Sequence, residues 1–506
     1  MTNKKFVFSF FVVAAVFSCS IIGFNIIGNP FGVWDVCSVV GLNRYAVQGE
    51  AMERLAKPLA VARYRPETIF LGNSLINLGL NPKHYEELTG RRAYNFAVDS
   101  CHPYEMRRYL EHILAACDGV REVLIAVDIS MLYPVEGIEA GFNESQIGRG
   151  YLSPELFAQA AFSLDTVRAS YESIKVNRRE RIAFASHNDD GQLSEGQQQR
   201  NYGNVWFYSF LQLNLRSGMA RDKKLDFDNL KEYRRIKELC DEHGVEMKLY
   251  IPPITAAGEA AFADFYGEKA MRRFLSEITA IEPVYDFGGI GEWNKDESPS
   301  SHELFWEAHH MKSALGDKVL DVLAGNSAPP SWLGFGKIIS ATDVDDYIRA
   351  KNVAKDEWKA SHPEMAREVS HLGYFAPMDI MDVPPSPDDF IHIDDICGKG
   401  RPSEIELSPR DNLRLAGWRM ALSGNARDVY VVLKNEAGEC RAALAAPVER
   451  NDVTSMFDND SYKAAGFLCE ASLKVLPPGE YEVRLLEMAD GTKHLSRKVA
   501  LLSVTK

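Results

Sequence analysis

A serine that directly follows a short apolar run is the first residue whose type and surroundings point to chemistry. The run Thr68–Leu71 leads into Gly72, Asn73 and Ser74. If this run is a strand of a parallel sheet, it places the Ser74 hydroxyl at the carboxyl edge, where such sheets bind ligands. The glycine allows a tight turn, and backbone N–H groups beyond it can face an oxyanion. Because Gly-x-Ser after a strand is a common pattern, a nucleophile is indicated only if a base accompanies it.

A candidate base lies far along the chain, in a loop that enters an expected helix. The loop contains Glu307, His309 and His310. A serine hydroxyl is almost un-ionised at neutral pH and needs a base to become a nucleophile. A carboxylate three residues before a histidine can hold the imidazole in one tautomer. We therefore expect His310 to accept the proton of Ser74 and Glu307 to orient His310. Two alternatives stay open: His309 as the base, or an ordinary surface loop.

Residues 66–325 alternate between short apolar runs and amphipathic stretches. Strand and helix in series predict parallel strands joined by right-handed crossovers, hence an α/β sheet. Within this domain, residues 138–225 are rich in charge and glutamine and predict a helical cap over the sheet edge. The expected strands are 68–71, 93–98, 123–127, 247–251 and 283–287, and the expected helices are 104–117, 229–243, 262–278 and 312–323.

The N-terminal segment is long and apolar enough to cross a membrane. Residues 6–28 carry no charge, and two lysines precede them. At 1.5 Å per residue the segment spans a hydrocarbon core of about 30 Å. Lysines before the span place the N-terminus in the cytoplasm and the remainder outside. A cleaved signal peptide is the alternative. Residues 1–28 are therefore the expected anchor, and residues 29–65 an expected juxtamembrane segment.

The last part of the chain has a different sequence pattern from residues 66–325. Residues 326–401 are expected to form a helical and proline-rich connector. Residues 402–506 contain short apolar runs separated by turn signals, which predict a small antiparallel β-sandwich. Cys440 and Cys469 fall on two of these runs, so they predict either a disulfide or two isolated buried thiols.

Charge and cysteine spacing exclude some classes of function. The formal net charge is −14, which argues against a protein that binds nucleic acid or anionic lipid through a basic face. No cysteines and histidines cluster at zinc spacing, and the acidic run at 388–395 lacks the glycine and terminal glutamate of a calcium loop. We expect that run to be a solvated loop. Arg107 and Arg108 predict a solvated helix face, or else a contact to an anionic polysaccharide.

Together, the Gly-Asn-Ser block and the Glu-x-x-His block resemble the first and last blocks of the SGNH (GDSL-like) hydrolase superfamily. More specifically, the chain is similar to membrane-anchored bacterial SGNH proteins of exopolysaccharide systems, which resemble the alginate-type O-acetyltransferases. The resemblance implies a three-layer α/β/α fold, a covalent acyl-serine intermediate and no metal or organic cofactor. Further similar segments are 29–32, 54–58, 93–97, 103–106, 126–128 and 250–253.

The chain departs from the family pattern at three positions. Glu307 stands where the family usually has aspartate. Ser100 replaces the second-block glycine, whose N–H helps to build the oxyanion hole. Asp128 replaces the third-block asparagine, and an ionised carboxylate cannot donate to an oxyanion. Loss of one such donor costs on the order of 2.7–4 kcal/mol of transition-state stabilisation. Asn73 or another backbone amide is the expected compensation.

Two functions from different classes follow from the resemblance. The first is a serine esterase or O-acyltransferase, anchored in a bacterial inner membrane with periplasmic domains. It would act on acetyl or other acyl esters of an exported polysaccharide. The second is a non-catalytic protein that keeps the fold as a glycan-binding or scaffold surface. In both, the partners are an acylated glycan, the inner membrane through residues 6–28, and other exopolysaccharide-assembly proteins. The C-terminal sandwich is the expected glycan-binding module.

Overall fold

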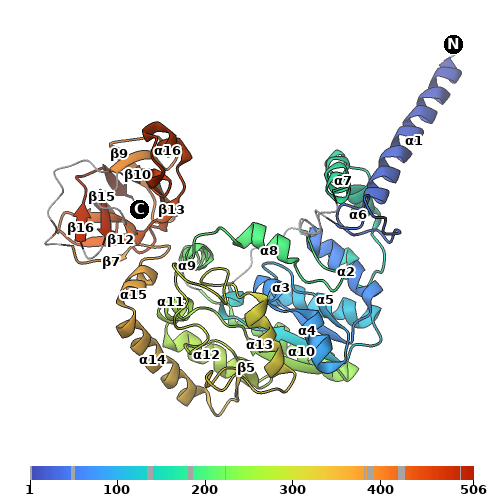
Figure 1. Cartoon of the computed structure of the whole chain (residues 1–506), viewed down its shortest axis with the longest axis horizontal. Helices are drawn as coiled ribbons and strands as arrows, with labels where there is room; N and C mark the ends of the chain where they lie inside the picture. The colour runs from blue at the N-terminus through green and yellow to red at the C-terminus, as the bar shows by residue number, and fades with distance from the viewer. Residues whose placement is uncertain are drawn as a thin grey trace.

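The computed structural model describes most of the chain and contains a mixed α/β domain, two further β-sheets and an N-terminal apolar helix (Figure 1). Residue 138, the expected start of the insert, lies outside the described residues. The described residues are 3–46, 52–133, 141–179, 186–222, 224–380, 383, 391–419, 428–489 and 492–505.

The α/β domain is built on a six-stranded sheet with the order β2-β1-β3-β4-β5-β6. The first five strands run parallel, and β6 pairs antiparallel with β5. Parallel pairing requires a crossover between successive strands, which the intervening helices supply. The parallel sheet predicted from the alternating pattern is therefore present. Its strands are β1 (Thr68–Leu71), β2 (Ala93–Asn95), β3 (Glu122–Ala126), β4 (Glu246–Ile251), β5 (Val284–Asp286) and β6 (Lys337–Ile339).

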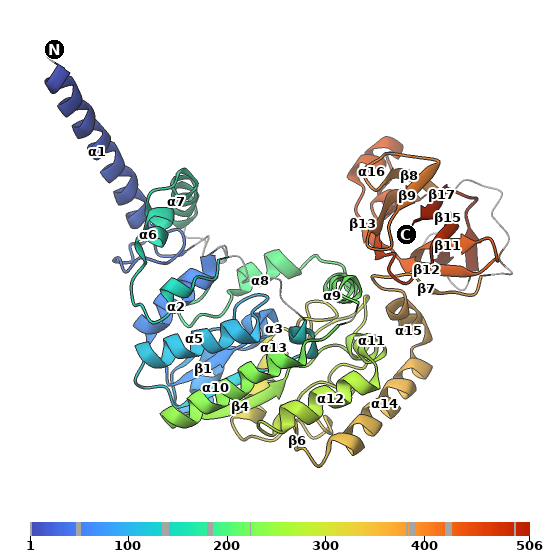
Figure 2. The same cartoon turned by 180° about the vertical axis from the view of Figure 1, so that it is seen from behind.

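Helices pack on both faces of this sheet, because successive strand residues point to opposite sides. Phe70 and Leu124 face one layer, whereas Ile69 and Val123 face the other. Figure 2 shows part of the second layer in front of the sheet. The first layer contains α3 (Ser74–Gly79), α4 (Pro82–Thr89), α11 (Ala256–Tyr266) and α13 (Ser313–Leu323); the second contains α2 (Glu53–Tyr64), α5 (Pro103–Ala116), α10 (Leu230–His243), α12 (Glu268–Thr279) and α14 (Val344–Ser361).

The insert between β3 and β4 divides into two parts. Its first two helices, α6 (Pro154–Ala161) and α7 (Leu164–Asn177), pack against the end of α1 (Asn3–Gly28). Its last two, α8 (Glu195–Tyr202) and α9 (Ser209–Ala220), lie over the α/β domain (Figure 1). The insert is helical as expected; its second part forms the cap, whereas its first two helices pack against α1, and α6 also packs against α2. Short 3-10 turns occur at Ile129–Leu132, Glu144–Gln146 and Phe227–Asn229.

The C-terminal region forms two sheets that share one core. Leu413 and Leu415 of one sheet pack with Val431 and Leu485 of the other. The first sheet has the order β13-β14-β10-β8; the second has the order β7-β12-β11-β15-β17-β9, with β16 beside β15. The strands are β7 (Ala376–Pro377), β8 (Ile391–Ile396), β9 (Glu404–Leu407), β10 (Asn412–Arg419), β11 (Asp428–Asn435), β12 (Cys440–Leu444), β13 (Ala446–Val448), β14 (Gly466–Ser472), β15 (Gly479–Ala489), β16 (Thr492–Leu495) and β17 (Ala500–Val504), with α16 (Asn451–Phe457) and a 3-10 turn (Asp460–Tyr462) between β13 and β14.

Several boundaries differ from those expected. The C-terminal sheets begin before residue 402, because β7 and β8 from the expected connector pair with β12 and β10. The acidic run at 388–395 is thus partly strand, since Ile393 and Ile396 enter the core and leave the aspartates outward. The pairing of β17 with β9 is parallel, whereas an antiparallel sandwich was expected. The expected helix at 262–278 is two helices, divided at Gly267, which has a positive φ of 77°.

The connector packs between the two folded regions. α14 lies on the α/β domain, and α15 (Pro363–Ser370) leads to the C-terminal sheets. The two regions also touch directly, because Arg216 of α9 forms a 2.9 Å ion pair with Glu470 of β14. Tyr430 and Val432 belong to the same apolar cluster as residues of α9 and α13. The C-terminal sheets are therefore held against the α/β domain by a shared core.

Candidate active site

Ser74 is the first residue of α3 and lies at the carboxyl edge of the sheet, where the sequence predicts it. Asn73 caps the helix, and its side chain accepts a hydrogen bond from Leu75 N–H at 3.1 Å. Gly72 is needed for close packing, since a Cβ there would lie 2.4 Å from Ile76 and 3.1 Å from Ala126. The strand, the glycine and the cap together fix the direction in which the Ser74 hydroxyl leaves the sheet.

Ser74, His310 and Glu307 form one chain of hydrogen bonds. Ser74 Oγ lies 2.9 Å from His310 Nε2, and His310 Nδ1 lies 2.5 Å from Glu307 Oε1. An ionised carboxylate can only accept a hydrogen bond, so Nδ1 carries the proton and Nε2 is free to accept from the serine. His310 and Glu307 are buried, while Ser74 is half-buried. The structure therefore brings the three predicted residues together in the order that nucleophilic catalysis requires.

Two glycines allow the elements carrying Ser74 and His310 to approach each other. Gly79 ends α3, and Gly316 lies in the first turns of α13, just after His310. A Cβ on Gly316 would lie 1.8 Å from the carbonyl oxygen of Gly79, and a Cβ on Gly79 would lie 2.4 Å from Met311. The small residues let the two helices pack at backbone contact. This contact sets the position of the histidine relative to the serine.

The loop that carries the histidines is clamped from three sides. Glu307 accepts from the backbone N–H groups of His309 at 3.1 Å and His310 at 2.7 Å, which fixes its carboxylate. Ala308 donates its N–H to Phe207 O at 2.7 Å and accepts at its carbonyl from Thr255 Oγ1 at 2.8 Å. The insert holds one side of the loop and α11 the other. A base fixed in this way needs little reorganisation when a proton moves.

Two aromatic side chains of the insert cover the imidazole of His310. The ring of Phe210 lies 4.7 Å from the His310 ring in an edge-to-face arrangement, and the ring of Tyr202 lies at 5.1 Å. Leu78 and Trp306 belong to the same cluster. Sequence reasoning predicted a cap but did not identify these residues. Their apolar faces shield the histidine from water, which strengthens its hydrogen bonds to Ser74 and Glu307.

The alternative base, His309, does not reach the serine. Its ring is buried against Phe262 at 5.7 Å and against His310 at 5.0 Å. Burial, together with the neighbouring His310, lowers the pKa of His309 well below its ordinary value. A neutral histidine in an apolar contact is a packing residue, so the geometry favours His310 over His309 as the partner of Ser74.

The expected oxyanion donors lie at the same sheet edge as Ser74. Ser100, where the family has glycine, adopts a φ of +57°, which is a conformation that glycine favours. The backbone at Ser100 is therefore in a conformation that a glycine would adopt without strain. In the part of the chain that the structure describes, the N–H groups of Ser74 and Ser100 make no hydrogen bond to protein atoms. Neither N–H group is therefore engaged within the described part of the protein. Asn73 is engaged with Leu75.

Asp128 lies just beyond the end of β3 and is half-buried. Its carboxylate accepts a hydrogen bond from Ser130 N–H at 2.6 Å and so caps the following turn. Burial raises the pKa of Asp128 above its ordinary value. Capping explains why a short oxygen-bearing side chain stands at this position. An asparagine would also cap the turn, and it would offer an N–H donor that the aspartate lacks.

A buried polar network lies behind α3 and was not predicted. Lys57 of α2 donates to Asn77 Oδ1 at 2.9 Å and also hydrogen-bonds Ala97 O. Asn77 donates to Asp99 at 3.1 Å and to Glu53 at 3.2 Å. Glu53 also accepts from the N–H of Asp99 at 2.7 Å. The juxtamembrane helix therefore holds both the serine helix and the loop that contains Ser100.

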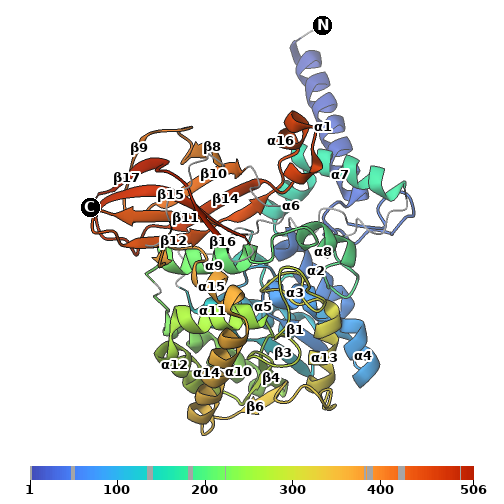
Figure 3. The same ribbon diagram turned by 60° about the vertical axis from the view of Figure 1, so that its left-hand side comes forward.

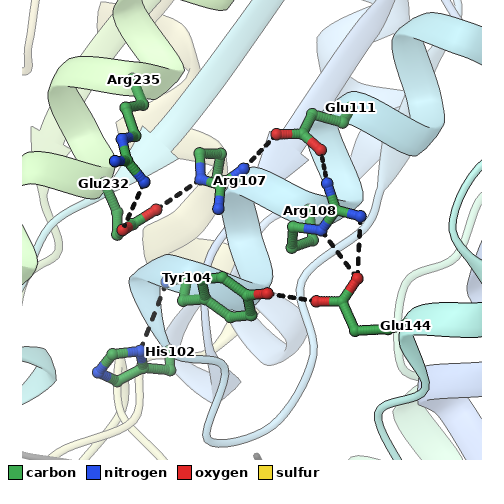
Figure 4. Close-up of polar contacts among 8 residues, drawn as sticks. All are labelled: His102, Tyr104, Arg107, Arg108, Glu111, Glu144, Glu232 and Arg235. Carbon is green, nitrogen blue, oxygen red and sulfur yellow. Dashed lines mark hydrogen bonds and ion pairs between the residues drawn. The ribbon is translucent and has the colours of Figure 1, made fainter.

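Arg107 and Arg108 are neutralised by carboxylates rather than open to an anionic glycan. Arg107 Nε lies 2.5 Å from Glu232, and Arg108 Nε lies 3.0 Å from Glu144. Both arginines also pair with Glu111, as Figure 4 shows. Since every guanidinium in this cluster already has a carboxylate partner, the cluster serves to join α5 to α10 and to the insert.

Other side chains that could bind or react were also located in the described part of the chain. Phe467 and Tyr481 are buried in the C-terminal core. All eight cysteines lie in described parts of the chain and carry free thiols, so the alternative of isolated thiols holds for Cys440 and Cys469. Within the described ranges, no group of three or more histidine, cysteine, aspartate or glutamate residues is arranged to hold a metal ion.

Comparisons with known proteins do not assign the chain to a family. No protein-family model matches it, and no curated protein matches it. One solved structure that matches is the endo-beta-1,4-mannanase from Thermotoga petrophila, at 8% sequence identity over 89% of this chain and 94% of the mannanase chain. Its TM-score is 0.16, so it carries no argument about fold or function. The site must therefore be interpreted from its own geometry.

Proposed function

We propose that this protein is an SGNH-type serine esterase or O-acyltransferase that works through an acyl-serine intermediate. The single observation that supports the proposal is the continuous relay from Ser74 Oγ through His310 to the buried Glu307. A histidine whose second nitrogen is held by a carboxylate is a base poised to activate a serine. The parallel sheet with helices on both faces is compatible with the SGNH arrangement.

The chemistry follows from the relay. Ser74 Oγ attacks the acyl carbonyl carbon while its proton passes to His310 Nε2. The carbonyl oxygen becomes an oxyanion, for which the N–H groups of Ser74 and Ser100 are the proposed donors. His310 then returns the proton to the leaving alkoxide as the ester bond breaks, which leaves an acyl-serine. In the second half, His310 takes a proton from water or from a sugar hydroxyl as its oxygen attacks the acyl carbon. The bond from the acyl carbon to Ser74 Oγ then breaks, and His310 returns the proton to Ser74 Oγ.

The proposed substrate is an acyl, most simply acetyl, ester of an exported polysaccharide. This assignment rests on the sequence resemblance and on an N-terminal helix of 25 residues that is apolar enough to span a membrane. The proposal places the N-terminus in the cytoplasm of a bacterial cell and the folded regions in the periplasm. The C-terminal β-sandwich is the proposed glycan-binding module. No metal or organic cofactor is required by the proposed steps.

The test is covalent labelling of the full chain, in detergent micelles, with a fluorophosphonate probe. We expect wild-type protein to be labelled on Ser74, and Ser74→Ala to be unlabelled, because only an activated serine attacks phosphorus readily. The matched control is Ser313→Ala, since Ser313 is also a helix N-terminal serine but hydrogen-bonds Leu78 O. Absence of labelling in folded wild-type protein would contradict the proposal. It would instead favour a non-catalytic glycan-binding scaffold, for which Asp128 at the expected donor position is the motivating observation.

We expect Asp128→Asn to label faster than wild type. The asparagine keeps the cap on Ser130 N–H and adds an N–H donor near the developing oxyanion, where one donor is worth roughly 10²–10³ in rate. The measurement is the second-order labelling rate near neutral pH, with Asp128→Ala as the variant that lacks both cap and donor. If Asp128→Asn is slower than wild type or unchanged, Asp128 does not stand at an oxyanion position.

A further inference from the structure

The last turn of α1 is fixed to the first two helices of the insert by buried polar contacts. Asn25 is buried, donates to Ala161 O at 2.9 Å and accepts from Ser170 Oγ at 3.0 Å. Gly28 packs so closely on α7 that a Cβ there would lie 2.9 Å from Ser170. An unpaired asparagine would be costly in this place, so its partners on α6 and α7 define one relative position. The end of α1 and these two helices form a single unit.

One side of α7 is used for this contact, and another side is apolar and exposed. The buried side consists of Thr166, Ser170, Ser173 and Asn177. On the exposed side, Leu164 is 79% exposed and Tyr171 is 61% exposed. Val167 and Ile174 lie on the same side and are half-buried, so the four apolar residues follow the helical spacing of three and four. In water, a stripe of this kind normally packs against a core. Here it does not.

Other large apolar side chains near the end of α1 are also exposed. They are Phe157 of α6, Phe162 directly after α6, and Val39 and Val40 of the segment after α1. Figure 3 shows α7 lying across the lower end of α1 rather than along it. Exposed apolar residues thus occur both on α1 and on the two helices that pack against its last turn at Asn25.

We propose that α6 and α7 lie in the headgroup region of the membrane that α1 spans, with their apolar residues in contact with lipid. The inference rests on the proposed membrane anchor. Residues 6–24 of α1 extend about 28 Å at 1.5 Å per residue, which fills a hydrocarbon core and leaves the turn at Asn25–Gly28 at its edge. A helix crossing at that level lies along the interface, where tyrosine and phenylalanine are favoured. Within α7, Asp165 and Glu172 balance Arg168 and Lys175, so apolar contact rather than charge holds the helix there.

This arrangement would fix how the candidate active site faces the membrane. Leu156 and Ala160 of α6 share a cluster with Leu55 and Leu59 of α2. Lys57 of that same helix reaches Asn77 on the serine helix. A continuous packed path therefore leads from the interfacial helices to the element that carries Ser74. A protein held at one depth and orientation would present Ser74 at a constant height to a glycan leaving the membrane.

The test is photo-cross-linking of the full chain in vesicles of phosphatidylethanolamine and phosphatidylglycerol. The photoreactive residue p-benzoylphenylalanine replaces one residue at a time, and lipid adducts are detected by mass spectrometry. Leu164 and Tyr171 are the test positions. Phe17, 65% exposed on α1, reports on the anchor. Val353, 56% exposed on α14, is the matched control, because α14 lies far from α1 (Figures 1 and 2).

We expect lipid adducts at Phe17, Leu164 and Tyr171, and none at Val353. Adducts at Phe17 without adducts at Leu164 and Tyr171 would overturn the interfacial assignment and leave the anchor intact. Absence of adducts at all three positions would overturn the anchor and, with it, this inference. Cross-links from Leu164 or Tyr171 to a second copy of the chain, in place of lipid, would show that the surface is a protein interface and would also overturn the inference. None of these results depends on whether Ser74 is reactive.

Discussion

Replacement of His310 by alanine is expected to slow the acylation of Ser74 by a factor on the order of 10⁴–10⁶. His310 Nε2 is the group at hydrogen-bond distance, 2.9 Å, from Ser74 Oγ. Without it, the serine proton has no acceptor as the hydroxyl attacks, and the hydroxyl is a poor nucleophile at neutral pH. The measurement is the rate of burst-phase acylation with an activated acetyl ester, or of fluorophosphonate labelling, on the full chain. Residual reaction would report on the oxyanion donors alone.

Glu307→Ala is expected to slow the acylation of Ser74 somewhat less, by a factor on the order of 10⁴, because the histidine remains but loses its fixed tautomer. Since Glu307 acts only through His310, the double variant His310→Ala, Glu307→Ala should react no more slowly than His310→Ala alone. Glu307→Asp keeps a carboxylate that can hold the imidazole, so it should recover part of the rate lost in Glu307→Ala. Additive losses in the double variant would contradict a relay and would assign Glu307 an independent role.

The control variant is His309→Phe. The side chain of His309 is buried against Phe262 and does not contact Ser74 in the structure, so an aromatic replacement should change the acylation rate by less than about tenfold. A loss as large as that of His310→Ala would reverse the assignment of the base. The two adjacent histidines thus distinguish a specific proton acceptor from general damage to the loop.

The pair Ser74 and His310 could be predicted from sequence because both positions follow from strand ends. Parallel strands place their carboxyl ends at one edge, so residues that follow the first and the last parallel strands, β1 and β5, can meet there. The neighbours of the pair could not be predicted in the same way. Tyr202 and Phe210 lie in an insert whose helices have no strand to fix their place, and only the folded loop at 305–311 shows where they dock.

The arrangement of the insert, in which one part caps the α/β domain and the other packs against α1, also could not be predicted from sequence. Its composition predicted helices but not which surface each would cover. The small polar residues of α7, such as Ser170, are compatible with a solvated face until the buried Asn25 is seen opposite them. Strand β8 was missed because the consecutive Asp394 and Asp395, at a register shift in its pairing with β10, interrupt the alternation of apolar and polar residues.

The buried network behind α3 was missed for a further reason. Charged residues are seldom buried, so a sequence assigns Glu53 and Lys57 to a solvated helix face. In the structure both are buried. The only hint in the sequence was that Lys57 lies in a segment similar to the SGNH proteins. Such a hint indicates importance but not a role.

Lys57→Met should therefore destabilise the region around Ser74 strongly. The substitution leaves the carboxylates of Glu53 and Asp99 near each other without their buried cation, and breaking a buried charge network in this way costs about 3–5 kcal/mol. The measurement is hydrogen exchange of the full chain, read at the amides of α2 and α3. The matched control is Lys237→Met, since Lys237 on α10 pairs with Asp241 at 2.5 Å on the surface, and such pairs contribute less than about 1 kcal/mol.

The pH dependence of the stability of Lys57→Met separates the contribution of charge from that of packing. Burial, followed by the charge of Glu53, raises the pKa of Asp99 to about 6, and burial lowers the pKa of Lys57 to about 8, so Lys57 is cationic at neutral pH. A carboxyl group with a raised folded-state pKa stabilises the fold when protonated, and that contribution is lost as the pH rises through the folded pKa. Without Lys57 the pKa of Asp99 should rise further. The loss of stability caused by Lys57→Met should then be large at pH ~7, where Lys57 is cationic and Asp99 ionised, and should shrink towards pH ~5.

If the stability lost in Lys57→Met stays constant between these pH values, Lys57 acts only through packing and its hydrogen bonds to Asn77 and Ala97. A deficit that shrinks on acidification, with slower labelling of Ser74 above the pKa of Asp99, would mean that charge balance in the network holds the serine helix in place. Because Asp99 directly precedes Ser100, the same charge balance would also hold the loop that contains Ser100. Helix α2 would then be part of what makes Ser74 reactive.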